Sequence, residues 1–237
     1  MSKVLDLTTD WHTHTDRSDG SATLQEMVQT AAGRGLRRLH VTDQVRATTT
    51  WVPDYVTEIA RVRAVSPIEI VSGVEAKLLD VRGALDLPDD LAGIDQVTIS
   101  DHQFPTRTGP ITPEEMGRRI AAGEIRAADA VGDLVLATSR AVLLRERVVV
   151  GHLFSALPKA GIHIDEVTGE MLSTLAAALR ETGSSVEVNE KWRTPTFAHV
   201  RALCGLAVEL VPASDAHSPA DLGAWDYVTQ AAAHITS

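Results

Sequence analysis

Residues 10–20, Asp-Trp-His-Thr-His-Thr-Asp-Arg-Ser-Asp-Gly, follow an apolar, β-prone run, Val4-Leu5-Asp6-Leu7. If that strand continues to His14, then His12 and His14 lie two residues apart and point to the same face. Asp19 follows on a Ser-Asp-Gly turn, which can fold its carboxylate back over the strand end. An isolated His-x-His also fits a polar strand exit with two solvated histidines, so the interpretation as a chelating pair depends on the rest of the chain.

The composition fits one large domain spanning residues 1–237. Hydrophobic residues make up 44% of the chain and aromatic residues only 4%, so Ala, Val and Leu fill the apolar positions. This pattern favours helices packed closely on strands over a β-sandwich, and α/β barrels of this length form a single unit.

The net charge and the cysteine content indicate which binding partners are excluded and which cellular compartment is favoured. A net charge of −10 argues against nucleic acid and anionic lipid as partners. The single Cys204 allows no internal disulfide, which suits a reducing compartment. No apolar run reaches the roughly 20 residues of a membrane span, and we see no signal core. We therefore expect a cytoplasmic protein, and the oligomeric state stays open.

Strands and helices are expected to alternate seven times, which predicts parallel strands joined by crossover helices. After the first strand, further strands are expected at 36–43, 68–75, 95–102, 147–152, 185–189 and 208–215. Helices are expected at 23–35, 52–65, 112–143 with a break near Gly123, 165–182, 196–206 and 219–234. A closed β/α barrel brings the carboxyl ends of its strands to one rim, where such folds carry out chemistry. An open doubly wound sheet is the alternative, but it would spread these strand ends too far apart.

Imidazoles and carboxylates gather at these expected strand ends. They are His12, His14, Asp19, Glu75, His102, His152, Asp215 and His217. Each alone is commonly a cap or a satisfied polar group, but together they form a donor set that suits zinc, manganese or iron. Eight ligands are too many for one ion and suit two or three divalent ions. Glu75 is the natural bridge, and a water shared by two such ions becomes a hydroxide nucleophile near neutral pH.

With these residues in place, the chain resembles the PHP family, the polymerase and histidinol phosphatase domain. The opening motif matches residues 10–20, Gly-x-Glu matches 73–75 and Ser-Asp-Ala-His matches 214–217. Thr-Asp-His matches 42–44 with one departure, Gln44, and His102 and His152 match isolated strand-end histidines. The resemblance spans residue 10 to about residue 223. It implies a distorted seven-stranded (β/α)7 TIM-like barrel with a trinuclear metal centre that hydrolyses phosphate esters.

The resemblance also implies how the ligands are shared. The first metal takes His12, His14, Glu75 and Asp215, and the second takes the bridging Glu75 with His102 and His152. The third takes Asp19, His217 and the residue at position 44, which is normally histidine. Because Gln44 offers only a neutral amide oxygen, we expect the third site to be the weakest. Glu75, Asp215 and His217 are the expected catalytic residues.

Three cations close to strand ends are candidates for binding the substrate: Lys77, Lys191 and Arg193. Arg matches the geometry of a phosphate group and Lys supplies a point charge, although ordinary surface charge explains them equally well. His40 is expected in the core, and Asp43 is expected to support the rim.

The sequence therefore predicts a metal-dependent phosphoesterase that acts on a small phosphorylated metabolite, with histidinol phosphatase as one version. The alternative is a degenerate, non-catalytic barrel that binds metal or a partner, which Gln44 keeps open. The substrate and the physiological metal are not determined by the sequence.

Overall fold

The computed structural model describes residues 5–235, so Val4 of the expected first strand lies outside the described residues. Seven parallel strands form one sheet in the order β1 to β7, so each strand pairs with the next one along the chain. Their bounds are β1 Thr9–Thr13, β2 Arg38–Gln44, β3 Glu69–Lys77, β4 Gln96–Ser100, β5 Val149–Gly151, β6 Ser185–Asn189 and β7 Glu209–Ala213.

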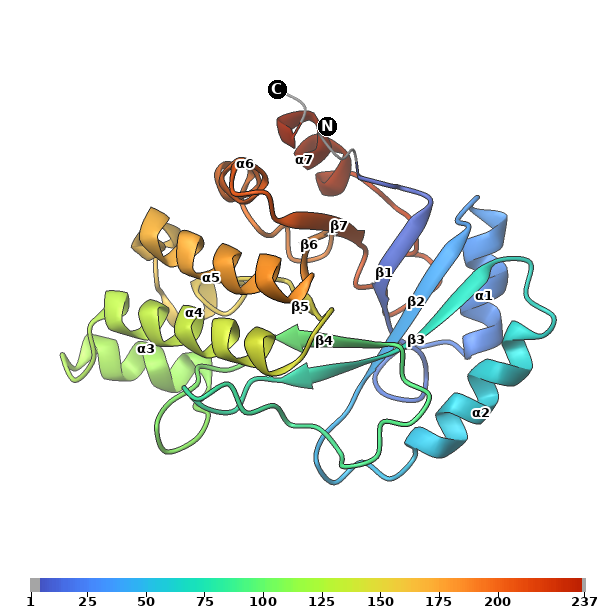
Figure 1. Cartoon of the computed structure of the whole chain (residues 1–237), viewed down its shortest axis with the longest axis horizontal. Helices are drawn as coiled ribbons and strands as arrows, with labels where there is room; N and C mark the ends of the chain where they lie inside the picture. The colour runs from blue at the N-terminus through green and yellow to red at the C-terminus, as the bar shows by residue number, and fades with distance from the viewer. Residues whose placement is uncertain (1–4, 236–237) are drawn as a thin grey trace.

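The helices lie outside the curved sheet (Figure 1). Their bounds are α1 Leu24–Gly33, α2 Val52–Arg63, α3 Pro113–Ala121, α4 Ala127–Leu144, α5 Gly169–Thr182, α6 Phe197–Gly205 and α7 Tyr227–Ile235, with short 3-10 helices at Pro158–Ala160 and Ile164–Glu166. No helix within residues 5–235 is both long and apolar enough to cross a membrane.

The two edge strands, β1 and β7, meet and nearly close the barrel. The His14 amide donates to the Ala216 carbonyl at 2.9 Å, and the Asp215 amide donates to the His12 carbonyl at 2.9 Å. The buried Asp10 carboxylate adds a third link, because its Oδ1 accepts the Ser214 amide at 2.9 Å. The expected barrel is confirmed, and the open-sheet alternative is wrong.

Apolar packing between sheet and helices occupies the outer layer of the barrel. One cluster lies under α4 and α5 and includes Leu134, Val150 and Leu175, all at most 2% exposed. A second lies under α1 and α2 and includes Met27 and Ile59. Each such side chain contributes roughly 1.5–3 kcal/mol by leaving water. The outer layer thus carries the hydrophobic core, which leaves the strand ends free for polar residues.

The break expected near Gly123 is confirmed. The helix α3 ends at Ala121, and Gly123 follows in the left-handed region with φ of 72°. A glycine adopts this conformation without the steric cost that other residues incur, so the chain can end one helix and start α4 a few residues later.

Two element boundaries differ most from the expected ones, beside smaller shifts such as the start of α5 at Gly169 rather than at 165. The first strand begins at Thr9 because the Asp6 carboxylate accepts bonds from Thr8 and Thr9, which holds a turn there. The last helix begins at Tyr227 rather than at 219. There the Glu190 carboxylate accepts the amides of Tyr227 and Val228, both at 2.9 Å, and so caps the N-terminus of α7.

Candidate metal centre

The opening motif reaches the rim through a bulge in β1. Asp10 pairs with Leu39 and Thr13 pairs with Val41, so β1 contains one extra residue between these pairs. Such bulges redirect side chains at the edges of functional sites. Here His12 and His14 both turn into the barrel, and their Nε2 atoms lie 3.0 Å apart. The expected same-face pair therefore forms, and the bulge lies at its start, between Asp10 and Thr13.

Two other residues at the rim have an unusual backbone. His152 has φ of 27° and Asp215 has φ of 54°, a region that non-glycine residues seldom adopt. Both side chains are buried, at 1% and 3% exposure. Strain of this kind persists only where surrounding contacts hold it, and it is concentrated at functional sites.

A first cluster consists of His12, His14 and Asp215. His14 Nε2 lies 3.0 Å from His12 Nε2 and 3.3 Å from Asp215 Oδ1. The other oxygen of Asp215 accepts the Trp192 indole N–H at 2.8 Å, which fixes the orientation of the carboxylate. Three donor atoms thus converge on one point.

A second cluster consists of Glu75, His102 and His152. Glu75 Oε1 lies 3.1 Å from the Nε2 atom of each histidine, and these two Nε2 atoms are 3.0 Å apart. Ligands bound to one zinc ion at about 2.0–2.2 Å are separated by distances of this order. The spacing therefore fits a single divalent ion.

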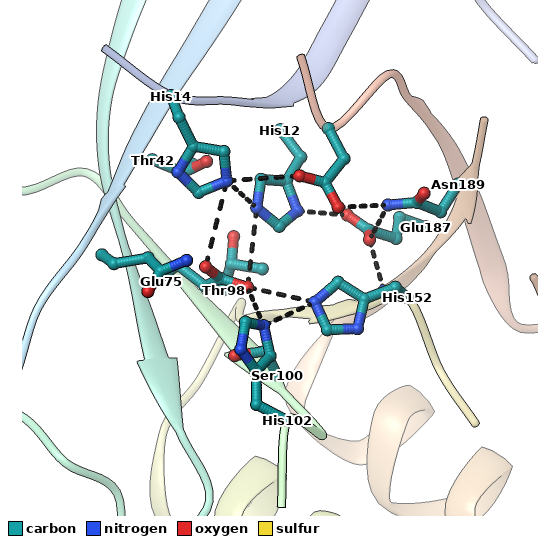
Figure 2. Close-up of polar contacts among 12 residues, drawn as sticks. His12, His14, Thr42, Glu75, Thr98, Ser100, His102, His152, Glu187 and Asn189 are labelled. Carbon is teal, nitrogen blue, oxygen red and sulfur yellow. Dashed lines mark hydrogen bonds and ion pairs between the residues drawn. The ribbon is translucent and has the colours of Figure 1, made fainter. Parts of the chain in front are cut away.

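Glu75 lies between the two clusters, with the imidazoles of His12, His14, His102 and His152 turned toward it (Figure 2). Its Oε1 is 3.7 Å from His12 Nε2, and its Oε2 is 3.9 Å from His14 Nε2. Among residues 5–235, the buried Oε2 atom has no hydrogen-bond partner. An unpaired carboxylate oxygen in this position fits a cation on the first cluster's side.

Carboxylates behind the clusters fix the state of two imidazoles. His12 Nδ1 lies 2.9 Å from Glu187 Oε2, and His152 Nδ1 lies 3.1 Å from Asp101 Oδ1. Each Nδ1–H donates to its carboxylate, so in the neutral ring Nε2 carries the lone pair. Lone pairs facing one another and Glu75 repel unless a cation lies among them. The donor set therefore fits metal ions, with the outer carboxylates orienting the ligands.

The pKa shifts agree with a site that attracts positive charge. Burial would lower the pKa of His12, but Glu187 and Asp215 raise it to about 9. Burial would raise the pKa of Glu75, yet hydrogen bonds from His102 and His152 hold it well below its usual range. Protons and metal ions compete for the same nitrogen lone pairs, so binding of metal is expected to release protons.

Asp19 and His217 lie at one edge of the first cluster, where both side chains are partly exposed. His217 Nε2 is 3.4 Å from Asp19 Oδ2, and Asp19 Oδ1 is 3.6 Å from His14 Nδ1. The Gln44 amide donates to Asp19 Oδ2 at 3.0 Å. The residues expected at a third site are therefore adjacent, but Gln44 presents an N–H rather than a donor atom for a metal.

The three candidate cations have different positions. Lys191 Nζ lies 2.9 Å from His217 Nδ1 and 3.8 Å from Asp215 Oδ1, at the edge of the clusters. Lys77 is the last residue of β3 and follows Glu75 by two residues, so its side chain lies on the same face of the strand. Arg193 instead points to Asp226 at 3.4 Å and lies over the Tyr227 ring. The structure thus places Lys191 at the clusters and Lys77 on the strand face of Glu75, and it does not bring Arg193 to them.

Other residues singled out in the sequence have supporting positions. The buried Asp43 accepts bonds from Thr15 and Ser18, so it holds the loop of the opening motif. His40 is buried and stacks on Trp11 with ring centroids 4.1 Å apart, and burial lowers its pKa to about 4. Asp101, which the sequence left open, is the partner of His152.

Glu187 was not found from the sequence, because it lies inside β6 rather than at a strand end. Its side chain is fully buried, and Oε1 accepts both the His152 amide and the Asn189 amide group. The available signal was a charged residue in Ser-Val-Glu-Val-Asn, a strand that is buried at every position. A carboxylate in such a strand needs partners within the barrel.

The family model for the PHP domain matches residues 10–191. No curated protein sequence matches the chain. Among solved structures, the histidinol phosphate phosphatase HisK from Lactococcus lactis, in complex with zinc, L-histidinol and phosphate, is similar with a TM-score of 0.70 and 19% identity, over 96% of this chain and 92% of that one. HisK from Listeria monocytogenes, described as a putative histidinol phosphatase, is similar with a TM-score of 0.64 and 13% identity, over 91% of this chain and 97% of that one. At these identities, both likenesses show the fold.

We expect Glu187→Gln to weaken metal binding by about 10–100-fold, the usual cost of losing an outer partner of a ligand. A glutamine oxygen can accept from His12, but its NH₂ group then faces the Asn189 amide and the His152 N–H, which are also donors. Calorimetric titration with Mn²⁺ measures the effect, and Glu181→Gln on the exposed surface of α5 is the matched control. Equal affinities in the two variants would contradict the role of Glu187.

Proposed function

The chain belongs to the PHP domain family of metal-dependent phosphoesterases, and we propose that it hydrolyses the phosphate ester of a small phosphorylated metabolite. The observation that carries this proposal is Glu75, whose carboxylate lies between two clusters of ligands. Two divalent cations held side by side polarise phosphoryl oxygens and lower the pKa of a bound water, which is the chemistry of ester hydrolysis.

The residues around the clusters have distinct roles in this proposal. Glu75 and Asp215 supply the anionic ligands, while His12, His14, His102 and His152 supply neutral ones. His217, with a side chain 26% exposed, faces the solvent side and contacts the substrate. Lys191 and Lys77 attract the phosphate group. The single cysteine suits activity in a reducing compartment, so we place the enzyme in the cytoplasm.

An assay of phosphate release with added Mn²⁺ tests the function across a panel of phosphorylated metabolites that includes L-histidinol phosphate. We expect turnover of at least one ester, and we expect His12→Ala to abolish it because the first cluster loses a buried ligand. His163→Ala is the matched control, since His163 is 76% exposed and pairs with Asp165. Lack of turnover on the whole panel by metal-loaded protein would favour the non-catalytic, metal-binding barrel.

Loss of the bridging carboxylate should cost more than loss of a terminal ligand. Glu75→Ala removes a charged ligand from both clusters, whereas His152→Ala removes one neutral ligand from one cluster. Because even an outer partner is worth about 10–100-fold, we expect Glu75→Ala to reduce kcat/KM at least about tenfold more than His152→Ala. Metal content is measured in parallel. If Glu75→Ala keeps its metal and its turnover, Glu75 does not bridge.

Lys191 should bind the anionic part of the substrate. Removing a charge-assisted hydrogen bond costs roughly 1.5–3 kcal/mol, or about ten- to a hundredfold in affinity. We therefore expect Lys191→Ala to weaken competitive inhibition by inorganic phosphate by this factor. Arg193→Ala is the matched control, because it removes a cation two residues away that points to Asp226. Equal inhibition constants for phosphate in the two variants would show that Lys191 does not bind the substrate and is an ordinary surface charge.

A further inference from the structure

The edge formed by Asp19 and His217 is short of ligands for a third metal ion. His14 belongs geometrically both to this edge and to the first cluster. However, its Nε2 points to His12 and Asp215, and only Nδ1 faces Asp19. A neutral imidazole has one lone pair. Once Nε2 serves the first cluster, Nδ1 carries the proton and can only donate.

Gln44 does not supply the missing ligand. Its amide nitrogen donates to Asp19 Oδ2 at 3.0 Å, so its N–H points to the carboxylate that a metal would use. Within the part of the chain that the structure describes, this edge then has two ligands for a metal, Asp19 and His217. Two ligands are fewer than the three or four protein donors that hold zinc-type ions. The residues present therefore do not fit a firmly bound third ion.

Lys191 brings a positive charge to the same edge. Its Nζ lies 2.9 Å from His217 Nδ1, 3.4 Å from His217 Nε2 and 3.8 Å from Asp215 Oδ1. His217 Nδ1 also lies 2.9 Å from the Asp215 backbone carbonyl oxygen, which can only accept, so Nδ1–H donates there and Nε2 keeps the lone pair, 3.4 Å from Asp19 Oδ2. His217 Nε2 therefore remains a ligand, but the Lys191 ammonium beside the same ring is a positive charge that would repel a cation held there. The lysine thus opposes a metal ion at this edge through its charge, where two ligands remain.

We propose that the Lys191 ammonium replaces the third cation, so that this chain binds two metal ions and carries its third positive charge on its own side chain. The inference rests on the proposed function of the same site. The Lys191 side chain is 42% exposed, so its ammonium remains accessible to a phosphate group. Lysine is a compact point charge on a flexible stem and suits this position.

The test counts the ions bound per chain in the full-length protein. Wild type and variants are loaded with excess Mn²⁺, freed of weakly bound metal by desalting and analysed by plasma mass spectrometry. We expect about two ions in the wild type, in Gln44→His and in Lys191→Met, because each single change leaves either the ammonium or the glutamine in place. We expect about three ions in the double variant Gln44→His/Lys191→Met, with anomalous scattering from crystals locating the third between residues 19, 44 and 217.

A second double variant, Gln44→His/Lys191→Arg, is the matched control, because it adds the histidine but keeps a cation. We expect it to hold about two ions. Three tightly bound ions in the wild type, or two ions in a folded Gln44→His/Lys191→Met variant, would overturn the inference. Neither result would contradict the proposed function, because the number of bound ions does not measure hydrolysis. Conversely, a wild type with two ions and no turnover on any ester would contradict the proposed function and leave the role of Lys191 intact.

Discussion

The site depends on one buried carboxylate, Glu75, surrounded by four imidazoles. Burying an ionised carboxylate costs several kcal/mol unless charged or polar partners compensate for lost water. Here the partners are imidazole nitrogens. In the neutral rings of His12 and His152, Nδ1–H donates to a carboxylate, so the Nε2 atom on the site side carries a lone pair. The arrangement is therefore electrostatically incomplete without cations. Metal ions that bind only the folded chain would stabilise it by mass action, so the fold and the site are thermodynamically linked.

The barrel supports this polar interior because its apolar packing lies elsewhere. The helices bury the outer face of the sheet, while the barrel buries carboxylates that orient the histidines, such as Glu187 in β6 and Asp101 after β4. Closure of the ring also uses a buried carboxylate, because Asp10 links β1 to β7. The left-handed backbone at His152 and Asp215 persists because buried hydrogen bonds hold both residues. Geometry at the rim is thus set by polar contacts between strands.

Much of this architecture could be predicted from the sequence, because its signals are local. Alternating strands and helices predict a parallel ring, and histidines or acids after strands predict convergence at one rim. Side-chain direction could not be predicted in the same way. Arg193 and Lys191 follow the same strand, yet only Lys191 turns to the clusters, because Asp226 and Tyr227 hold Arg193. Glu187 was missed for a related reason, since its importance comes from partners on other strands.

Contacts between strands also explain why Gln44, in place of histidine in the Thr-Asp-His motif, affects Asp19 and Lys191 on other parts of the rim. A histidine at position 44 would leave Asp19 free to bind an ion, whereas the Gln44 amide occupies that carboxylate. A positive charge is still useful at this edge, because a phosphate group that enters the site is anionic. Lys191 provides that charge without depending on the concentration of free metal. An ammonium tethered to the chain cannot dissociate, whereas an ion held by two ligands exchanges readily. The edge is therefore better interpreted as a cationic binding position built from protein than as a weakened metal site.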